Sequence, residues 1–380
     1  MTGFPIRRSL SQHAKFALIQ RSQPLVYRQY VGACMGWVCA HNDWDPLEEI
    51  VVGSAIGSSI PRPDLSVFTI HFHDCGSPDG IPSGPFPPHM VEQTEQELSE
   101  LCQALDQLGV TVRRPEPVAE DAILATPHWE TDGLYEYCPR DSLLVVGETL
   151  IEAPMPVRGK HLKALTYRRL ALEYFHNGAR WIAAPRPELR DELYDPDRPE
   201  GCRLLDLEPC FDAANIVRLG TDILYYVSDS ANETGARWLQ SVLDRSYTVH
   251  LCRGLNVNDH IDTTIVPLRP GLVLLNPARV DDTNLPLYFR NWDMVWCPDP
   301  VDTRDESVES FSSIWIAMNI LMVRPDLAIV DRRQHELIKT LEAHKIDVLP
   351  LQLTYDRTIG GGFHCATLDI RRSGELECYR

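Results

Sequence analysis

At 380 residues the chain can form one large or two ordinary domains, and its 44% of hydrophobic residues is enough for a sizeable core. Its 54 acidic residues against 36 basic ones give a net charge of −18, which argues against nucleic acid or an anionic membrane as the main partner. A cationic small molecule fits this charge better.

The sequence predicts neither secretion nor a membrane span. Its first twenty residues are partly basic and lack an uninterrupted apolar core with a small-residue cleavage site. The longest apolar run, IWIAMNILMV at 314–323, is interrupted by Asn319 and is too short to cross a bilayer. Eleven cysteines, an odd number without a C-x-x-C pair, are typical of free thiols in a reducing compartment. We therefore expect a cytoplasmic protein.

Residues 53–88 are rich in Pro, Gly and Ser, and we expect them to form a loop-like surface excursion near the functional site or an interface. Within this segment, HFHDC at 71–75 resembles a metal-binding cluster. It lacks a second pair of ligands at zinc spacing, so no metal is expected there.

A helix followed by a strand recurs along the chain. Residues 89–109 have leucines at helical spacing, Gly109 stands where the helix would end, and the strand-like VTVRRPEP follows. The same order of amphipathic helix, short cap and β-rich strand returns in three later segments, at 167–187, 236–253 and 332–352. Four occurrences indicate a repeated structural unit.

Paired strands are predicted between these helices. In SLLVVGETLIEAP at 142–154, Gly147 and Glu148 separate two apolar runs, as in a hairpin turn. Further strands are expected at 222–228 and within 262–277. The sequence contains no G-x-G-x-x-G or G-x-x-x-x-G-K-[ST] motif of a nucleotide-binding fold. We predict one α/β domain over residues 1–380, with internal pseudo-symmetry and strand-strand-helix-strand units.

Two aspartates precede strand-like or apolar stretches. Asp141 stands in CPRDSLLVVG, and Asp212 stands in LEPCFDAANIVRLG. Taken alone, each is more typical of a turn or a capping carboxylate than of a functional group.

The segment NVNDHIDTTIVPL at 256–268 is more informative. If it is a strand, His260, Asp262 and Thr264 share one face, so that an imidazole and a carboxylate converge. A histidine satisfied by its neighbour at a sheet surface is an equally good interpretation of this pattern.

Near the C-terminus, TIGGGFHCATLDIRRSG places three glycines, His364 and Cys365 just before a predicted strand. Glycines carry a large entropic cost and are used where the backbone takes unusual dihedrals or is closely approached. A free cysteine is usually an inert core residue, but a thiolate is a strong nucleophile. Here the glycine-rich setting favours a functional thiol.

Together, CPRD…LLVVG…EAPM, EPCFDAAN, HID, GLVLLNP, FSSIWIAMNILM and GGGFHCATLDIRR closely resemble the amidinotransferase family that includes glycine amidinotransferase. The similarity runs in order from about residue 130 to the C-terminus. Within the family, the sequence most resembles the amidinotransferases of guanidinium-toxin biosynthesis, such as the saxitoxin pathway.

The resemblance implies a pentein-type fold, a five-bladed α/β propeller of strand-strand-helix-strand units around a central channel. It also implies that Cys365 is the nucleophile, His260 the general acid/base and Asp212 the carboxylate partner of that histidine. The remaining matches are substrate-binding positions, with Asp141 and Asp262 for the guanidinium and Arg279, Ser312 and Ser313 for the α-carboxylate and backbone of the donor.

These residue types suit the chemistry. A guanidinium is planar, cationic and resonance-stabilised, so carboxylates can hold it in bidentate geometry and a soft nucleophile can attack its carbon. Two positions depart from the glycine-specific pattern. Asp259 stands where those relatives have an apolar residue, and Asn215 stands where they have an acidic one. We therefore include Asp259 among the substrate-binding candidates and expect an acceptor larger than glycine.

The main hypothesis is a transferase that moves the amidino group of L-arginine through a cysteine adduct, by a ping-pong route, to a primary amine in the biosynthesis of a saxitoxin-like guanidinium toxin. No metal or organic cofactor is expected, and a homodimer is left open. The alternatives are an L-arginine:glycine amidinotransferase, an arginine deiminase of the same fold that uses water in place of the amine, and a catalytically silent guanidino-binding protein.

Overall fold

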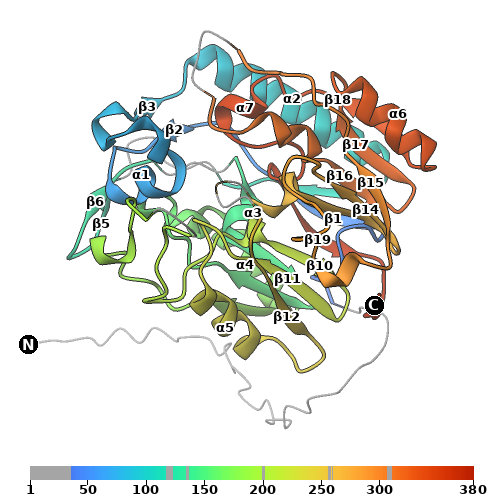
Figure 1. Ribbon diagram of the computed structural model, residues 1–380, viewed down its shortest axis with the longest axis horizontal. Coiled ribbons are helices and arrows are strands. Elements are labelled where there is room, and N and C mark those ends of the chain that lie inside the picture. The colour runs from blue at the N-terminus through green and yellow to red at the C-terminus, as the bar shows by residue number, and fades with distance from the viewer. Residues whose placement is uncertain are drawn as a thin grey trace, which may run out of the picture. The chain divides into compact units, whose positions relative to one another are not determined.

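The computed structural model describes the chain from residue 36 onward, except for six short internal segments; the described residues are 36–116, 123–133, 137–198, 202–255, 258, 260–305 and 310–380. Asp259 therefore lies outside the described residues. The expectation of one domain over 1–380 also extends beyond them and stays a prediction. The described chain is a mixed α/β structure (Figure 1).

Five three-stranded sheets contain most of the strands of the described chain, and all five have the same pairing. In each, the middle strand pairs antiparallel with one neighbour and parallel with the other. Four sheets use consecutive strands: β7 (Leu143–Val146), β8 (Thr149–Glu152) and β9 (Arg180–Ala183); β10 (Ile216–Leu219), β11 (Asp222–Tyr226) and β12 (Thr248–Cys252); β13 (Ile265–Arg269), β14 (Leu272–Leu275) and β15 (Asp293–Trp296); β16 (Leu321–Arg324), β17 (Leu327–Asp331) and β18 (Asp347–Leu351).

The fifth sheet joins the two ends of the described chain. Its middle strand β1 (Leu47–Val52) pairs antiparallel with β19 (Thr367–Arg372) and parallel with β4 (Thr111–Arg113). The sequence repeats had indicated a strand after the helix at 89–109, but they did not show that the C-terminal strand completes this unit.

Helices connect the second and third strands in four of the five units: α2 (Pro88–Gln107), α4 (Arg168–His176), α5 (Glu233–Val242) and α6 (His335–Ala343). The predicted strand-strand-helix-strand order is thus confirmed there. Gly109 has φ +84°, the left-handed conformation that a residue after a helix often takes. The unit of β13, β14 and β15 differs, since the described connection contains only a short 3₁₀ turn, η8 (Leu287–Phe289).

Residues 53–88 contain more regular structure than the predicted loop. They form α1 (Leu65–His71), the 3₁₀ turns η1 (His73–Cys75) and η2 (Pro78–Gly80), the two-stranded pair β2 (Ser59–Ile60) and β3 (Gly84–Pro85), and the first residue of α2. Asp64 begins α1, because its Oδ1 accepts hydrogen bonds from the backbone N–H groups of Ser66 and Val67. This Asx cap gives a helix start that the Pro and Gly content of the segment obscured.

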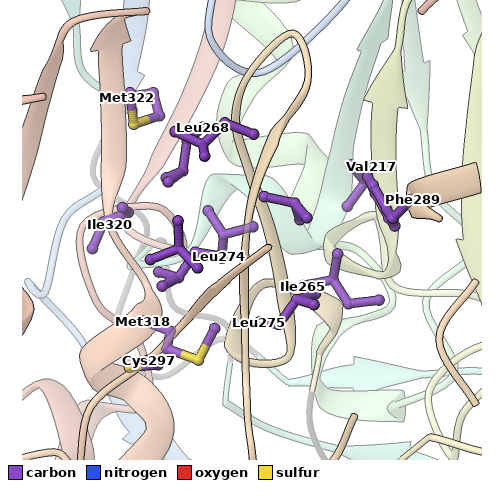
Figure 2. Packing of buried hydrophobic residues seen from close by; sticks show 14 of the residues in the cluster. Val217, Ile265, Leu268, Leu274, Leu275, Phe289, Cys297, Met318, Ile320 and Met322 are labelled. Atoms are coloured by element: carbon purple, nitrogen blue, oxygen red, sulfur yellow. The ribbon is translucent and has the colours of Figure 1, made fainter. Parts of the chain in front are cut away.

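The largest apolar cluster lies where β10, β13 and β14 meet β16 (Figure 2). A strand that is covered on both faces buries its side chains on both sides. This explains why LVLL and IVPL are continuous apolar runs without polar alternation. Members drawn in Figure 2 include Val217, Ile265, Leu268, Leu274, Leu275, Phe289, Met318 and Met322, all less than a tenth exposed.

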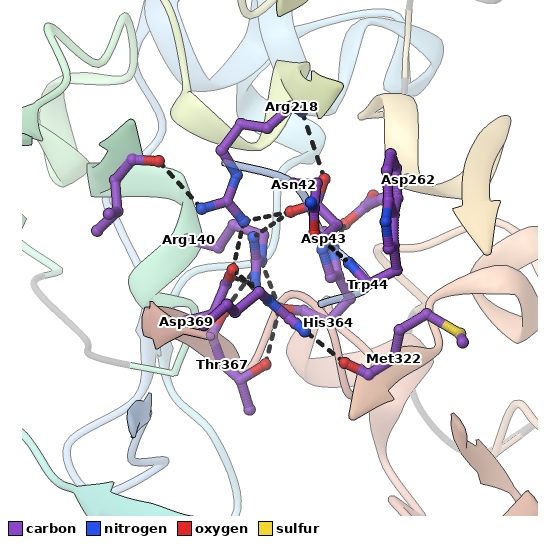
Figure 3. Close-up of polar contacts among 12 residues, drawn as sticks. Asn42, Asp43, Trp44, Arg140, Arg218, Asp262, Met322, His364, Thr367 and Asp369 are labelled. Carbon is purple, nitrogen blue, oxygen red and sulfur yellow. Dashed lines mark hydrogen bonds and ion pairs between the residues drawn. The ribbon is translucent and has the colours of Figure 1, made fainter. Parts of the chain in front are cut away.

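A second interior region is charged and lies between strands of different sheets (Figure 3). Arg218 on β10 is paired with both Asp43 and Asp369. Asp369 on β19 also accepts from Arg140 Nη2 at 2.7 Å and from Arg372 Nε at 2.8 Å. Burying single charges is costly, but in this network each buried charge has a partner. The network connects β10 and β19 to the segment that precedes β7.

Nine of the described cysteines are free thiols, in line with the sequence expectation, but Cys39 is disulfide-bonded. The expectation of free thiols throughout is therefore wrong at Cys39, because cysteine spacing does not reveal pairing. Within the described residues, no helix combines the length and hydropathy needed to cross a membrane.

Candidate active site

Cys365 lies in the loop between α7 (Asp356–Ile359) and β19, and the glycines before it have separate structural reasons. Gly360 ends α7 with φ +91°, a conformation that disfavours other residues. A Cβ on Gly361 would lie 2.8 Å from both Cys138 Sγ and Cys365 Cβ. A Cβ on Gly362 would lie 2.8 Å from Asn319 Cβ. The glycine run thus lets the loop turn and pass between buried side chains.

Asn319 holds Cys365 from the opposite side of the loop. Its Oδ1 accepts the backbone N–H of Cys365 at 2.8 Å, and its Nδ2 donates to Cys365 Sγ at 3.0 Å. Cys365 is only 4% exposed. A third polar atom, Asp262 Oδ2, lies 3.5 Å from the sulfur.

The charged network also supports this loop (Figure 3). Arg140 Nε donates to the carbonyl oxygens of His364 and Thr367, at 2.9 and 3.1 Å. His364 in turn places its Nδ1 2.7 Å from Asp262 Oδ2. The residues on both sides of the thiol are therefore anchored by buried polar groups.

The segment at 260–264 is not the predicted strand. His260 precedes the 3₁₀ turn η7 (Ile261–Thr263), and β13 begins only at Ile265. Thr263 Oγ1 donates to the carbonyl of His260 at 3.0 Å, and this local bond closes the turn. The turn directs His260 to Asp212, with Nε2 3.2 Å from Oδ2, and Asp262 to the thiol. The alternating face was wrong, and His260 and Asp262 bond to different partners, Asp212 and His364.

Asp141 lies in the short helix α3 (Pro139–Ser142), beside two lysines that the sequence analysis did not single out. Its Oδ2 lies 3.1 Å from Lys160 Nζ and 3.9 Å from Lys163 Nζ, while His260 Nδ1 is 3.9 Å from Oδ1. Burial alone would raise the pKa of Asp141, but the two ammonium groups outweigh it and hold this pKa well below its usual range.

The protonation states of the thiol and the imidazole follow from these neighbours. Burial would lower the pKa of His260, but the hydrogen bond to Asp212 and the charges of Asp141, Asp212 and Asp262 raise it to about 9. The contact with Cys138, burial and the nearby carboxylates raise the pKa of Cys365 well above its usual value. At neutral pH the site thus holds an imidazolium and a neutral thiol.

Three carboxylate oxygens at this site lack hydrogen-bond partners among the described residues: Asp141 Oδ1, Asp212 Oδ1 and Asp262 Oδ1. All three are buried, and leaving a buried acceptor unpaired carries a free-energy cost. Asp212 and Asp262 approach His260 and Cys365 through their other oxygen, Oδ2, whereas Asp141 Oδ1 itself lies 3.9 Å from His260 Nδ1. The arrangement can accept several N–H donors of one cationic group.

The residues expected to hold the donor's α-carboxylate lie close together. Arg279 Nη2 donates to Ser313 Oγ at 2.9 Å, and Arg279 Nη1 donates to Thr263 Oγ1 at 2.8 Å. Thr263 belongs to η7, so this cluster is joined to the turn that carries Asp262. Ser312 is adjacent in sequence, and its backbone bonds to Arg357 in both directions.

A cavity of about 80 Å³ borders the site, because Gly360 and Lys160 belong to its lining. The rest of the lining is mostly apolar, with Val67, Phe72, Phe86, Val157 and Phe311. His71, at the end of α1, also lines it. HFHDC thus contributes a cavity wall, and the described residues contain no cluster of three metal-ligating side chains.

The chain is similar in sequence and structure to several known proteins. Over 347 residues the chain is 58% identical to inosamine-phosphate amidinotransferase 1 of Streptomyces glaucescens, covering 91% of this chain and 100% of that one. A solved inosamine-phosphate amidinotransferase from Streptomyces griseus matches with TM-score 0.88 and 56% identity over 90% of this chain and 99% of its own. An amidinotransferase of the saxitoxin pathway from Microseira wollei matches with TM-score 0.83 and 37% identity, over 90% and 100%. No family model matches the sequence.

The chain therefore belongs to the amidinotransferase family and is a transferase. The resemblance stated from the sequence is confirmed. A saxitoxin-pathway enzyme is among the matches, as expected, but the inosamine-phosphate enzymes share more of the sequence. DDAH from Pseudomonas aeruginosa, with TM-score 0.52 and 12% identity over 85% of this chain, shares the fold alone, which is the pentein fold.

Sequence reasoning missed several residues of this site. Asn319 was not singled out, although its run was assessed for hydropathy and contributed to the family resemblance, and Lys160 and Lys163 lie in a segment without a recognised motif. The interruption of an apolar run by one amide was a signal for Asn319. Arg140 directly precedes Asp141 in CPRD and could have been noted for that reason.

Proposed function

We propose that this protein transfers the amidino group of L-arginine to a primary amine through a covalent adduct on Cys365. The observation that carries the proposal is the set of unpaired oxygens on Asp141, Asp212 and Asp262 around a buried thiol. A guanidinium is planar, cationic and rich in N–H donors, so it would satisfy these acceptors and neutralise their charge.

In the first half-reaction, binding of the guanidinium offsets the carboxylates and lets the thiol lose its proton to solvent. The Cys365 thiolate attacks the guanidinium carbon and forms a C–S bond. The C–N bond to the δ-nitrogen then breaks, and His260, which is protonated at neutral pH, gives its proton to the departing ornithine amine. The amidino group remains on sulfur as a cation.

In the second half-reaction the acceptor amine attacks the amidino carbon. Neutral His260 takes one proton from that amine, the C–S bond breaks, and the thiolate and the imidazolium are restored. The hydrogen bond to Asp212 orients the imidazole in both steps. The linked cluster of Arg279 and Ser313, with Ser312, would hold the α-carboxylate of the donor, which supports an amino-acid donor.

For the acceptor we propose an amine larger than glycine in the biosynthesis of a guanidinium natural product. The similarity to enzymes named for inosamine phosphate supports a phosphorylated amino-cyclitol as the first acceptor to test, ahead of a saxitoxin-type precursor. Asn215 supports this direction, because it is a buried amide paired with Ser230 where glycine-specific relatives are expected to have a carboxylate. Asp259 remains a proposed contributor to acceptor choice.

We also propose that the five sheets are the blades of one propeller around a channel. The shared pairing pattern and the closure of the fifth sheet by β19 support this arrangement. A cytoplasmic location stays part of the proposal, supported by nine free thiols.

The test uses the purified protein with L-arginine alone. We expect one equivalent of ornithine to be released in a burst and the Cys365 peptide to gain the mass of an amidino group, with neither event in Cys365→Ser. Citrulline formation at a rate comparable with transfer would instead identify a deiminase. More than about a thousandth of wild-type transfer in Cys365→Ser would contradict the covalent route, because loss of a nucleophile costs orders of magnitude in rate.

A panel of amines then separates the acceptors. Inosamine phosphate should discharge the adduct faster than glycine does. Asp259→Met should raise kcat/KM for glycine-like acceptors without changing ornithine release. Equal discharge by every amine would contradict the proposed selectivity.

A further inference from the structure

Asn319 makes more contacts with the nucleophile loop than any role in the reaction given so far requires. We propose that Asn319 is a positioning residue that fixes the sulfur of Cys365 and favours its thiolate form. The inference rests on the proposed function, because it takes Cys365 as the nucleophile. In this inference Asn319 favours deprotonation of the Cys365 thiol although negatively charged carboxylates lie nearby.

The orientation of the Asn319 amide is set by chemistry. The backbone N–H of Cys365 can only donate, so the atom that faces it at 2.8 Å must be the carbonyl oxygen Oδ1. The NH₂ group therefore faces Cys365 Sγ, at 3.0 Å. An amide NH₂ can only donate, so its hydrogen bond to sulfur is stronger when the sulfur is a thiolate.

Two further neighbours of the sulfur have the opposite preference, because the contact with Cys138 and the charge of Asp262 both raise the pKa of the thiol. The carboxyl group of Asp262, whose Oδ2 lies 3.5 Å from the sulfur, is ionised. Burial raises its pKa, but the hydrogen bond with His364 outweighs this effect and lowers the pKa below its usual value. A carboxylate can only accept, so it favours the protonated thiol, whose S–H it can receive. A bound guanidinium that pairs with Asp262 removes the effect of this carboxylate on the thiol, and the hydrogen-bond donor of Asn319 remains beside the sulfur.

The amide cannot turn away from the sulfur. Asn319 is 2% exposed, and its backbone carbonyl oxygen accepts the backbone N–H of His364 at 3.3 Å, which joins the main chain at Asn319 to the loop. Gly362 passes so close that a Cβ on it would lie 3.0 Å from Asn319 Oδ1. The loop and the amide thus hold each other, and the donor stays aimed at the nucleophile before and after transfer.

The test measures the rate of alkylation of Cys365 by iodoacetamide as a function of pH, in the wild type, Asn319→Ala and Asn319→Asp. Loss of a hydrogen bond to a charged sulfur should raise the apparent pKa of the thiol by about one to two units in Asn319→Ala. Asn319→Asp keeps the acceptor for the Cys365 N–H and replaces the donor by a carboxylate oxygen, so its shift should be larger. If the alanine variant does not fold, the isosteric Asn319→Asp alone decides.

Asn232→Ala is the matched control. Asn232 is also a buried asparagine, 1% exposed, but its side chain bonds to backbone groups of residues 205, 208, 210 and 235. Its replacement should destabilise the protein without moving the pH profile of Cys365. A folded Asn319 variant with the wild-type profile, or an equal shift in Asn232→Ala, would overturn the inference. In the same samples, a missing ornithine burst in the wild type would instead refute the proposed function.

Discussion

Replacement of Asp212 by asparagine should change the protonation state of His260 without changing the shape of the site. Asp212 is fully buried, and its Oδ2 lies 3.2 Å from Nε2 of His260, whose side chain is 18% exposed. An amide of the same size removes the charge and the charge-assisted hydrogen bond. Burial lowers the pKa of His260, and in the variant fewer carboxylates oppose this effect, so the pKa should fall.

The size of the effect follows from the pKa of His260, about 9 against an ordinary value of 6.5. A fall to 6.5 or below corresponds to about 3 kcal/mol, at 1.36 kcal/mol per pKa unit. At pH 7.5 the protonated fraction of His260 would drop from about 97% to about 10% or less. In the proposed mechanism the protonated form is the acid that releases ornithine, so the burst should slow by at least the same factor.

The assay is an NMR titration of ¹⁵N-histidine-labelled protein, with the His260 resonance assigned by His260→Gln. Asp222→Asn is the matched control, because it removes a carboxylate 2.6 Å from a different imidazole, that of His250. The His260 titration should shift only in Asp212→Asn. An unchanged His260 midpoint in that variant would refute the reasoning, since the raised pKa would then have another origin.

The same shift predicts a pH dependence of folding stability. The folded-state pKa of His260 lies above its unfolded value, so the protonated imidazole stabilises the fold fully below pH 6.5. This stabilisation, up to about 3 kcal/mol, is lost as the pH rises from 6.5 through 9. Urea denaturation should show the loss in the wild type and a flatter profile in Asp212→Asn.

Two further predictions concern the nucleophile loop. Asp262→Asn should speed iodoacetamide alkylation of Cys365, because a carboxylate that raises the thiol pKa is gone, yet slow ornithine release, because a proposed acceptor for the guanidinium is gone; parallel changes in both rates would contradict this division. Gly361→Ala should destabilise the protein by about 1–3 kcal/mol in urea denaturation, since the new methyl would meet Cys138 and Cys365 at 2.8 Å. Gly80→Ala, whose nearest neighbour would be 3.5 Å away, should have little effect, and equal costs at the two glycines would count against the close packing.

The repeated units of the fold were visible in the sequence because each helix-to-strand step is local. The hairpin at Gly147 and the cap at Gly109 depend on one residue with positive φ, and glycine signals this directly. The missing α-helix before β15 and the pairing of β1 with β19 were not visible. The first departs from the repeat, and the second joins segments more than three hundred residues apart.

The site was predictable where a chemical group stood in a distinctive local setting. Cys365 after three glycines, and His260 beside Asp262, are of this kind. Lys160 and Asn319 contact site residues that are distant in sequence, and no local pattern marks such contacts. The strand expected at 260–264 failed because Thr263 can bond to the backbone three residues earlier, an option that alternation rules ignore.

The pairing of β1 with β19 has a consequence for biosynthesis on the ribosome. Leu47 pairs with Arg372, and Cys365 directly precedes the strand that makes this contact. An emerging chain can therefore build four of its sheets before the last one is possible, and the long loop between the two strands makes this closure an intrinsically late event. The thiol is anchored only after β19 has been synthesised and paired, so a polypeptide that stops before this strand carries no assembled candidate site.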